Sequence, residues 1–346
     1  MKRVNIFSIL TTIFLVAAVL SPIQAAADPA VKKTYQLSLA SIMPIDHLIT
    51  KSGDFYVRRV AELSGGKIKI KHYPSDTLFD QKAIPEAVMS GGCSMAINTS
   101  SRWAGYAPSN HFWETPFLLS NKAQIDKVAD AVIPIIDEEL YPKGAKLLGF
   151  VYYGDADMIG NSKRPVYKPE DLKGLKMRSF SILLSSALQS IGGTPVVMSS
   201  AEVYTAIQRG TIDGAISGSS TFVSRKWMEA LTHITLVRGM VSYPALPFTI
   251  AINRDIWENM EPSAQKILLQ AANETWKFSN SEVIEETDAA MKVLKARGNL
   301  KIHTIDFGSK EWKYWKDIMS GPAKAKYLEI GGRNAPKILE IIKQNE

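Results

Sequence analysis

Short apolar segments alternate with amphipathic ones along most of this 346-residue chain, and this alternation restricts the fold more than any other feature. The pattern predicts strands at 35–39, 67–73 and 94–98, with helices at 52–64 and 81–90 between them. Paired glycines follow both helices, as is typical of helix ends. Strands that alternate with helices indicate an α/β domain with a largely parallel sheet.

A second series of the same kind begins near Lys146. It predicts helices at 181–191 and 201–209 and strands at 147–153, 175–178, 194–197, 212–216 and 243–253. The last third of the chain is helical in pattern, with helices beginning at Pro262, near Lys310 and near Pro336. No repeat or low-complexity linker separates the two series. We therefore expect two α/β domains joined by chain that crosses between them as strand or helix.

The first 27 residues have the pattern of a secretory signal peptide. Two basic residues precede an apolar run from Val4 to Leu20, and the small residues 25–27 supply a cleavage site. A membrane anchor is the alternative, but the run is short for a span of about 20 residues and Pro22 lies just beyond its end. We expect cleavage after Ala27 or Ala25 and a periplasmic location.

Composition and motif content argue against several other classes of protein. The single cysteine, Cys93, allows no internal disulfide. The net charge of +7 falls to +5 without Lys2 and Arg3, and no Lys/Arg run is present to follow a nucleic acid backbone. The five histidines lie singly, and the common zinc, phosphate-loop and hydrolase motifs are absent. We expect no enzyme activity, no cofactor and no metal. An exported hydrolase or lyase stays an alternative, because residues distant in sequence can converge in space.

One arginine, Arg178, ends a short apolar run that Gly174 precedes, as expected of a strand that ends at a cleft. A guanidinium stays charged at physiological pH and binds a carboxylate through two parallel hydrogen bonds. The residues alone leave two interpretations. Arg178 either binds an anionic ligand or forms a salt bridge with an Asp or Glu of the same chain.

Motifs in a fixed order surround this arginine, namely DLKGLKMR (171–178), GGTPVVM (192–198) and EVYTAIQRGTIDG (202–214). Upstream of them stand HL (47–48), GGKIKIKHYPSDTL (65–78), AVMSGGCSMAI (87–97) and TPFLLSN (115–121). In this order they resemble the solute-binding proteins of tripartite ATP-independent periplasmic (TRAP) transporters, the DctP-type family. The resemblance covers nearly the whole chain after the signal peptide.

The resemblance implies a two-lobe periplasmic binding protein-like fold, with a ligand cleft between the lobes and a long helix from Pro262 that spans both. The implied division is 28–153 plus about 243–282 for lobe I, and 154–242 plus about 283–346 for lobe II. Hinges are expected at Tyr153-Gly154 and at 241–243. The implied partners are a small organic acid and inner-membrane transporter subunits, and we expect a monomer. A sensory protein that uses the same cleft is the alternative.

The resemblance also assigns Arg178 to the carboxylate of the ligand. It places further contacts at Gln81, Asn98, Thr99, Ser100, Ser181, Ser200 and Ser217, all of which are also typical turn or helix-cap residues. Asp155 and Asp157 are candidates for accepting ligand hydrogen bonds or for pairing with Arg178 in the empty state, and solvation in a loop is the alternative. Trp103 and Phe180, grouped with Tyr152, Met158 and Met198, predict a hydrophobic or aromatic monocarboxylate, although core packing explains each one singly.

Two departures from the family pattern bear on the ligand. Ala156 stands where many relatives carry a second arginine. Ile216-Ser217 stands where relatives that bind a metal together with a 2-oxo acid carry a Glu. The resemblance therefore predicts that Arg178 is the one strong charge on the ligand and that no metal bridges it.

Overall fold

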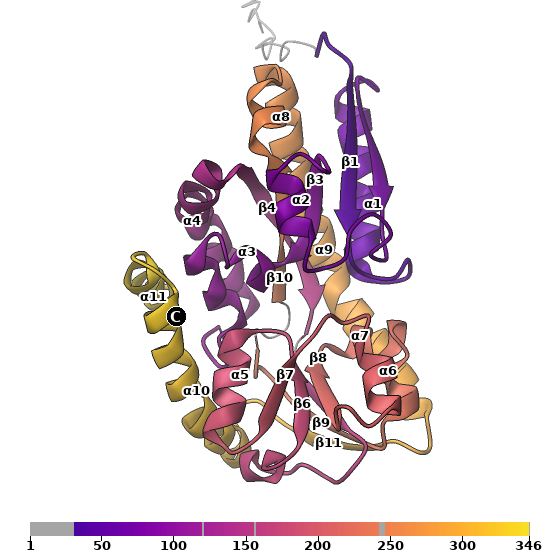
Figure 1. Ribbon diagram of the computed structural model, residues 1–346, viewed down its shortest axis with the longest axis vertical. Helices are drawn as coiled ribbons and strands as arrows, with labels where there is room; N and C mark the ends of the chain where they lie inside the picture. The colour runs from indigo at the N-terminus through magenta and orange to yellow at the C-terminus, as the bar shows by residue number, and fades with distance from the viewer. Residues whose placement is uncertain (1–30, 120, 156, 242–245, 346) are drawn as a thin grey trace, which may run out of the picture. The chain divides into compact units, whose positions relative to one another are not determined.

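The structure is a computed structural model, and it describes residues 31–119, 121–155, 157–241 and 246–345. The predicted signal peptide, Ala156 and part of the second predicted hinge, Ser242 and Tyr243, lie outside the described residues. Two mixed β-sheets with helices packed around them organise the described chain (Figure 1). The α/β class predicted from the alternating pattern is confirmed.

The first sheet has five strands in the order β2-β1-β3-β10-β4. Three of them pair in parallel, β1 (Tyr35–Ser41) with β2 (Ile68–Tyr73) and with β3 (Met95–Thr99). Strand β10 (Leu246–Asn253) is antiparallel to both its neighbours, β3 and β4 (Ala145–Gly154). We call this sheet and the helices between its strands lobe I. Those helices are α1 (Leu48–Leu63), α2 (Ile84–Met89), α3 (Ser100–Trp103), η1 (Pro108–Glu114), α4 (Lys122–Leu140), η2 (Tyr141–Lys143) and α8 (Arg254–Glu258).

The second sheet has six strands in the order β11-β9-β5-β8-β6-β7. Its strands are β5 (Met158–Asn161), β6 (Lys176–Ser179), β7 (Thr194–Val197), β8 (Gly214–Ser217), β9 (His233–Val237) and β11 (Lys301–Ile305). We call this sheet and the helices between its strands lobe II. Those helices are η3 (Pro169–Leu172), α5 (Ile182–Ser190), α6 (Val203–Gln208), α7 (Ser219–Ser224) and η4 (Trp227–Ala230).

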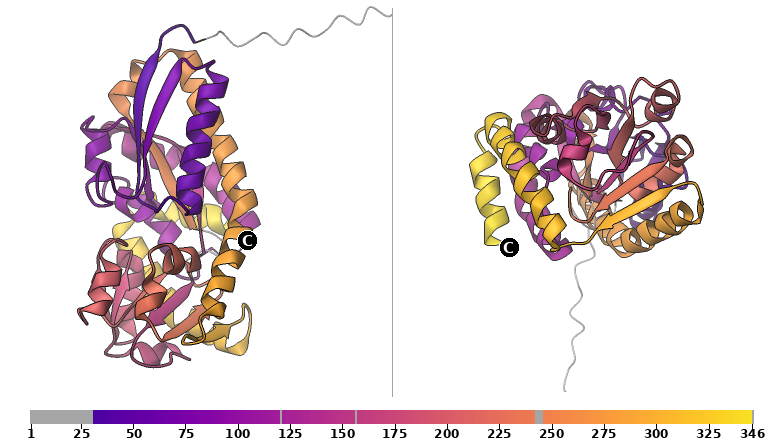
Figure 2. Two further views of the ribbon diagram at one scale, coloured as in Figure 1. Left: turned by 90° about the vertical axis from the view of Figure 1, so that its right-hand side faces the viewer. Right: turned by 90° about the horizontal axis from the view of Figure 1, so that it is seen from below.

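The long helix α9 (Pro262–Ala296) contacts both lobes. It packs against β4 and α1 of lobe I and against α7 of lobe II (Figure 2). Pro262 occupies its first turn, where the missing N–H has no helical partner to lose. The helix predicted to begin at this proline is therefore present, and it contacts both lobes as the resemblance implies. Beyond it, α10 (Lys310–Ile330) packs against α5, and α11 (Ala335–Gln344) packs against α4 and η1.

The chain passes between the sheets at β4 to β5, between β9 and β10, and along α9. The first passage begins at Gly154, which has a φ of +134°, a backbone conformation that favours glycine. The hinge at Tyr153-Gly154 stays a prediction. The lobe boundaries 28–153 with 243–282 and 154–242 with 283–346 stay a prediction. The strands follow this division, whereas α11 packs on α4 of lobe I.

The sheets are more mixed than the alternating pattern predicts. The difference arises because β10 and β5 follow a crossing between the lobes rather than a helix within one lobe, and each then pairs antiparallel to its neighbours. Within the described ranges, no helix combines the length and hydropathy that a membrane span needs.

Gly214 offers a test of how tightly β5 and β8 pack. A Cβ at this position would lie 2.0 Å from the carbonyl oxygen of Gly160 and 2.7 Å from Cα of Asn161, and neither backbone atom moves without disturbing the strand pair. We expect Gly214→Ala to lower the free energy of unfolding by about 1–3 kcal/mol in urea titrations. Gly298→Ala is the control, because its Cβ meets no atom within 4 Å. Equal stability of both variants would contradict the packing.

Candidate functional site

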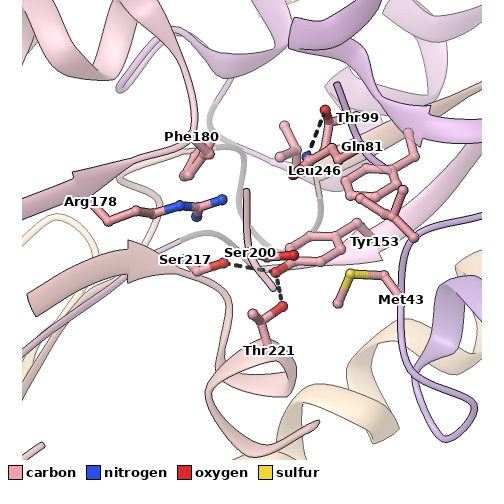
Figure 3. Close-up of a pocket in the computed structure, with 12 residues that line it drawn as sticks. Met43, Gln81, Thr99, Tyr153, Arg178, Phe180, Ser200, Ser217, Thr221 and Leu246 are labelled. Atoms are coloured by element: carbon pink, nitrogen blue, oxygen red, sulfur yellow. Dashed lines mark hydrogen bonds between the residues drawn. The ribbon is translucent and has the colours of Figure 1, made fainter. Parts of the chain in front are cut away.

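A pocket lies where residues of both lobes meet around Arg178 (Figure 3). Its cavity volume is about 20 Å³, which leaves room for little more than one water molecule. The lining residues are Ile42, Met43, Gln81, Thr99, Tyr153, Arg178, Phe180, Ser200, Ser217, Thr221, Leu246 and Phe248. A small organic molecule therefore enters this pocket only if the lining residues of the two lobes move apart.

Arg178 extends from β6 into this pocket, and its side chain is buried. Its Nε–H donates to the carbonyl oxygen of Met198 at 3.3 Å, and Nη1 donates to that of Ile216 at 3.2 Å. The guanidinium carbon also lies 5.4 Å from the ring centre of Trp227 and 5.7 Å from that of Phe180. These contacts fix the side chain and use two of its five N–H groups.

Within the described ranges, no Asp or Glu lies close enough to Arg178 to form a salt bridge. Burial lowers the pKa of Arg178 to about 10, so the side chain still carries its charge at neutral pH. A desolvated charge without a counterion is costly, and this cost is relieved when an anion binds beside it. Of the two interpretations drawn from the sequence, this geometry favours the anionic ligand.

Three hydroxyl groups meet beside the arginine. Tyr153, the penultimate residue of β4, shares hydrogen bonds with Ser217 Oγ at 2.9 Å and with Thr221 Oγ1. Ser217 ends β8, and Thr221 lies on the following helix, α7. Burial raises the pKa of Tyr153, so the phenol stays protonated and serves as both donor and acceptor.

The lobe I side of the pocket contributes an amide and a hydroxyl. Gln81 Nε2 donates to Thr99 Oγ1 at 3.3 Å, and Thr99 ends β3. The other amide atom of Gln81, Oε1, is buried and has no partner among the described residues. A buried acceptor of this kind is suited to a donor group on a bound molecule.

Apolar side chains make up the rest of the wall. Ile42 and Met43 follow β1, Leu246 and Phe248 lie on β10, and Phe180 follows β6. The ring of Phe248 stacks on that of Tyr153, with centres 4.8 Å apart and an interplanar angle of 3°. The pocket therefore combines one cation, a few polar groups and an apolar wall.

Six of the eleven residues predicted from the sequence line this pocket, namely Gln81, Thr99, Arg178, Phe180, Ser200 and Ser217. The other five lie outside its lining, and four of them are engaged in structural hydrogen bonds: Asn98 with Gln81 O and Thr99 N, Ser100 with Pro247 O, Ser181 as the N-cap of α5, and Asp155 with Ser219. Trp103 is fully buried in the core. For Ser181 the cap alternative describes what the side chain does, whereas the hydroxyl of Ser100 bonds to β10.

Sequence reasoning misses several lining residues, most clearly Tyr153 and Thr221. It assigns Tyr153 only to a hinge and places the neighbouring Tyr152 at the cleft. In the structure, Tyr152 points the other way, stacking on Trp276 and donating to Asp126. A strand places successive side chains on opposite faces, so the alternation in β4 is the signal that separates the two tyrosines.

Two carboxyl groups occupy the passage from β4 to β5. Asp155 Oδ1 accepts the N–H and the hydroxyl of Ser219, each at 2.9 Å, at the start of α7. Asp157 accepts the N–H of Gly239 at 2.6 Å and that of Val241 at 2.8 Å. Through Asp155, the segment between β4 and β5 is bonded to α7. Through Asp157, it is bonded to the chain that follows β9.

A Ser–His–Asp chain lies in lobe I, outside the pocket lining. His72 is 2.7 Å from Ser41 Oγ through Nε2 and 2.7 Å from Asp54 Oδ1 through Nδ1. In hydrolases the aspartate is buried and the serine faces the substrate. Here the order is reversed, since Ser41 is 1% exposed and the Asp54 side chain is 65% exposed. No acyl group reaches Ser41, so the arrangement is structural.

The described ranges also contain no group of three or more His, Cys, Asp or Glu side chains arranged to hold a metal ion. Ile216, at the position where metal-binding relatives carry a Glu, contributes only its carbonyl oxygen to Arg178.

Comparison with known proteins gives a family match over most of the chain. Residues 39–328 match the family described as bacterial extracellular solute-binding protein, family 7. A solute-binding protein of Verminephrobacter eiseniae is 31% identical over 73% of this chain and 75% of its own length. The 2,3-diketo-L-gulonate-binding periplasmic protein of Escherichia coli is 29% identical over 71% of this chain and 74% of its own length.

Solved structures match the fold. A TRAP periplasmic solute-binding protein of Roseobacter denitrificans, with bound β-D-glucuronate, superposes with a TM-score of 0.81. The match covers 90% of this chain and all of that one, at 21% identity. These comparisons confirm the resemblance drawn from the motifs, the two-lobe fold and the expectation that the chain is a transport protein and not an enzyme.

The carboxyl group of Asp157 predicts a pH dependence of stability. Burial and the nearby Asp155 raise its pKa to about 8, against the effect of the two N–H donors. Because the folded protein then holds this proton more tightly than the unfolded chain, the stabilisation is full below about pH 4 and is lost as pH rises toward 8.

We expect Asp157→Asn to remove this contribution, so that its free energy of unfolding falls less, or rises more, than that of the wild type between pH 4 and pH 8 in urea titrations. The control is Asp130→Asn, an exposed carboxylate on α4, which should leave the slope as it is. Parallel profiles for the wild type and Asp157→Asn would contradict the prediction.

Proposed function

Because the chain belongs to family 7 of the bacterial extracellular solute-binding proteins, we propose that it captures a monocarboxylate in the pocket around Arg178 and delivers it to TRAP transporter subunits in the membrane. A receptor for organic acids is the class that the family and its relatives support. The acid's single carboxylate, its apolar body and the delivery step are the parts that we propose.

The observation that carries the proposal is the buried guanidinium of Arg178, which has no carboxylate beside it in the described part of the chain. Two carbonyl groups orient it, and the rest of its planar fork faces the pocket. A carboxylate fits this fork with two parallel, charge-assisted hydrogen bonds. The hydroxyl groups of Tyr153 and Ser217 line the same pocket, and since their mutual hydrogen bond uses one of their two protons, the group that accepts in it can donate to the anion.

The apolar wall supports an acid with a hydrophobic or aromatic body. The side chains of Ile42, Met43, Leu246 and Phe248 line the pocket from lobe I, and Phe180 adds a ring next to the guanidinium. Arg178 is the one charged residue in the pocket lining among the described residues. With Ala156 in the sequence in place of a second arginine, a second carboxylate of a ligand has no cation assigned to it.

The position of the pocket supports closure of the two lobes around a bound acid. Its residues come from both lobes, so an acid that contacts both stabilises the arrangement in which they meet. We propose that this closed form, acting as a monomer in the periplasm after removal of the signal peptide, is what the membrane subunits recognise.

The substitution Arg178→Met tests the assignment of the carboxylate. It removes the charge while keeping an unbranched apolar chain, so we expect affinity for the bound acid to fall by roughly two to four orders of magnitude in calorimetry. The unfolding midpoint without added acid should stay the same or rise, because a desolvated charge is lost. Arg58→Met, at an exposed position on α1, is the control. Binding by Arg178→Met at the wild-type affinity would refute the assignment.

A panel of acids tests the proposed body of the ligand. We expect phenylacetate, benzoate and isovalerate to raise the melting temperature more than succinate or glucuronate, because the pocket offers one cation and an apolar wall. Differential scanning fluorimetry with equal acid concentrations measures this. Larger shifts with succinate or glucuronate would contradict the proposed apolar body of the ligand. In that case, the affinity of Arg178→Met for the better-bound acid still tests whether Arg178 binds the carboxylate.

A further inference from the structure

His47 lies outside the pocket lining but joins both lobes. It is the N-cap of α1, where its Nδ1 accepts the N–H of Ile49 at 3.1 Å. The side chain is fully buried, and its Nε2 lies 3.1 Å from Ser220 Oγ on α7 of lobe II. The same imidazole therefore caps a helix of one lobe and bonds a helix of the other.

The hydrogen bonds define which nitrogen carries the proton. Because Nδ1 accepts from a backbone N–H, a neutral imidazole has its proton on Nε2, which donates to Ser220. Burial lowers the pKa of His47 to about 3, and the positive charges of Arg225 and Lys51 act in the same direction. The charged groups around it are paired with one another, Lys51 with Glu286 of α9 and Arg225 with Asp76.

The imidazole also packs on a pocket residue. Its ring stacks on Tyr153 with centres 5.1 Å apart and an interplanar angle of 21°. Phe248 stacks on the same tyrosine with centres 4.8 Å apart, so two rings hold the phenol in place. Its hydroxyl then reaches Ser217 and Thr221, one on each side of the turn into α7.

We propose that His47 is a positioning residue that links closure of the lobes to the shape of the acid-binding pocket. Its bond to Ser220 requires α7 of lobe II to lie against the start of α1. Its stacking on Tyr153 fixes the hydroxyl group that faces the pocket together with Ser217 and Thr221. This inference rests on the proposed function, because it assumes that the acid binds at Arg178.

The variants His47→Asn and Ser220→Ala separate this role from helix capping. Asn is among the best N-cap residues, so His47→Asn keeps the cap of α1 while losing both the ring and the bond to Ser220. Ser220→Ala loses only the bond between lobes. His303→Asn, at a half-buried position on β11, is the matched control.

The probe is whichever acid of the panel of phenylacetate, benzoate, isovalerate, succinate and glucuronate binds the wild-type protein most tightly. Its dissociation rate is measured by stopped-flow fluorescence. We expect it to rise roughly tenfold or more in His47→Asn and about two- to tenfold in Ser220→Ala. Adding Ser220→Ala to His47→Asn should have little further effect, because the bond is already lost. The unfolding free energy without acid should change little in Ser220→Ala, whereas His47→Asn lowers it because a fully buried ring is lost.

A wild-type dissociation rate in both single variants would overturn the inference and leave the proposed function in place. Effects that simply add in the double variant would also overturn it, as would a loss of stability of Ser220→Ala without acid that matches its loss of affinity. Both outcomes indicate an ordinary structural role. Failure of the wild type to bind any acid of the panel would refute the proposed function, and the inference would fall with it.

Discussion

The burial of the Arg178 guanidinium without a carboxylate beside it is the constraint on which the site depends. Two carbonyl groups, one after β7 and one on β8, hold the side chain between them. Both are available because β6 lies between β7 and β8 in the sheet, so the ends of the three strands meet around one side chain. Carbonyl groups orient a guanidinium but do not neutralise it. The fold therefore keeps a positive charge at low dielectric, where an anion gains most from pairing with it.

Glu114 acts on this charge from a distance, without forming a salt bridge with Arg178, and Asp155 forms none with it either. Asp155 accepts two hydrogen bonds from Ser219, and Glu114 accepts the N–H of Ser101. Burial raises the pKa of Glu114 to about 7 and that of Asp155 to about 6, which reduces the negative charge that either contributes. An acid that paired with Arg178 directly would compete with the solute for the same N–H groups.

The sequence was sufficient for most single elements and for the arginine, because both depend on local patterns. The strand that carries Arg178, the helix from Pro262 and the alternation of strands and helices are all present near the predicted positions. Pocket membership was harder to predict, since it depends on pairing between distant segments. Phe248 reaches the pocket because β10 inserts between β3 and β4, which lie far away in sequence. Asn98 and Ser181 have suitable side chains, yet local backbone groups already use them.

Closure of this pocket is a property of groups from both lobes and not of the arginine alone. Arg225, at the end of α7, donates to the carbonyl of Ile42 and to Asp76 at 3.0 Å, so lobe II is bonded directly to a wall residue of lobe I. His47 bonds the other end of the same short helix. Because α7 also carries Thr221 and follows Ser217, a movement of this helix changes the pocket and the contacts between the lobes together. An acid that orders the hydroxyl groups around Tyr153 therefore stabilises the closed arrangement of the lobes. By linkage, closure strengthens the binding of the acid by the same free energy.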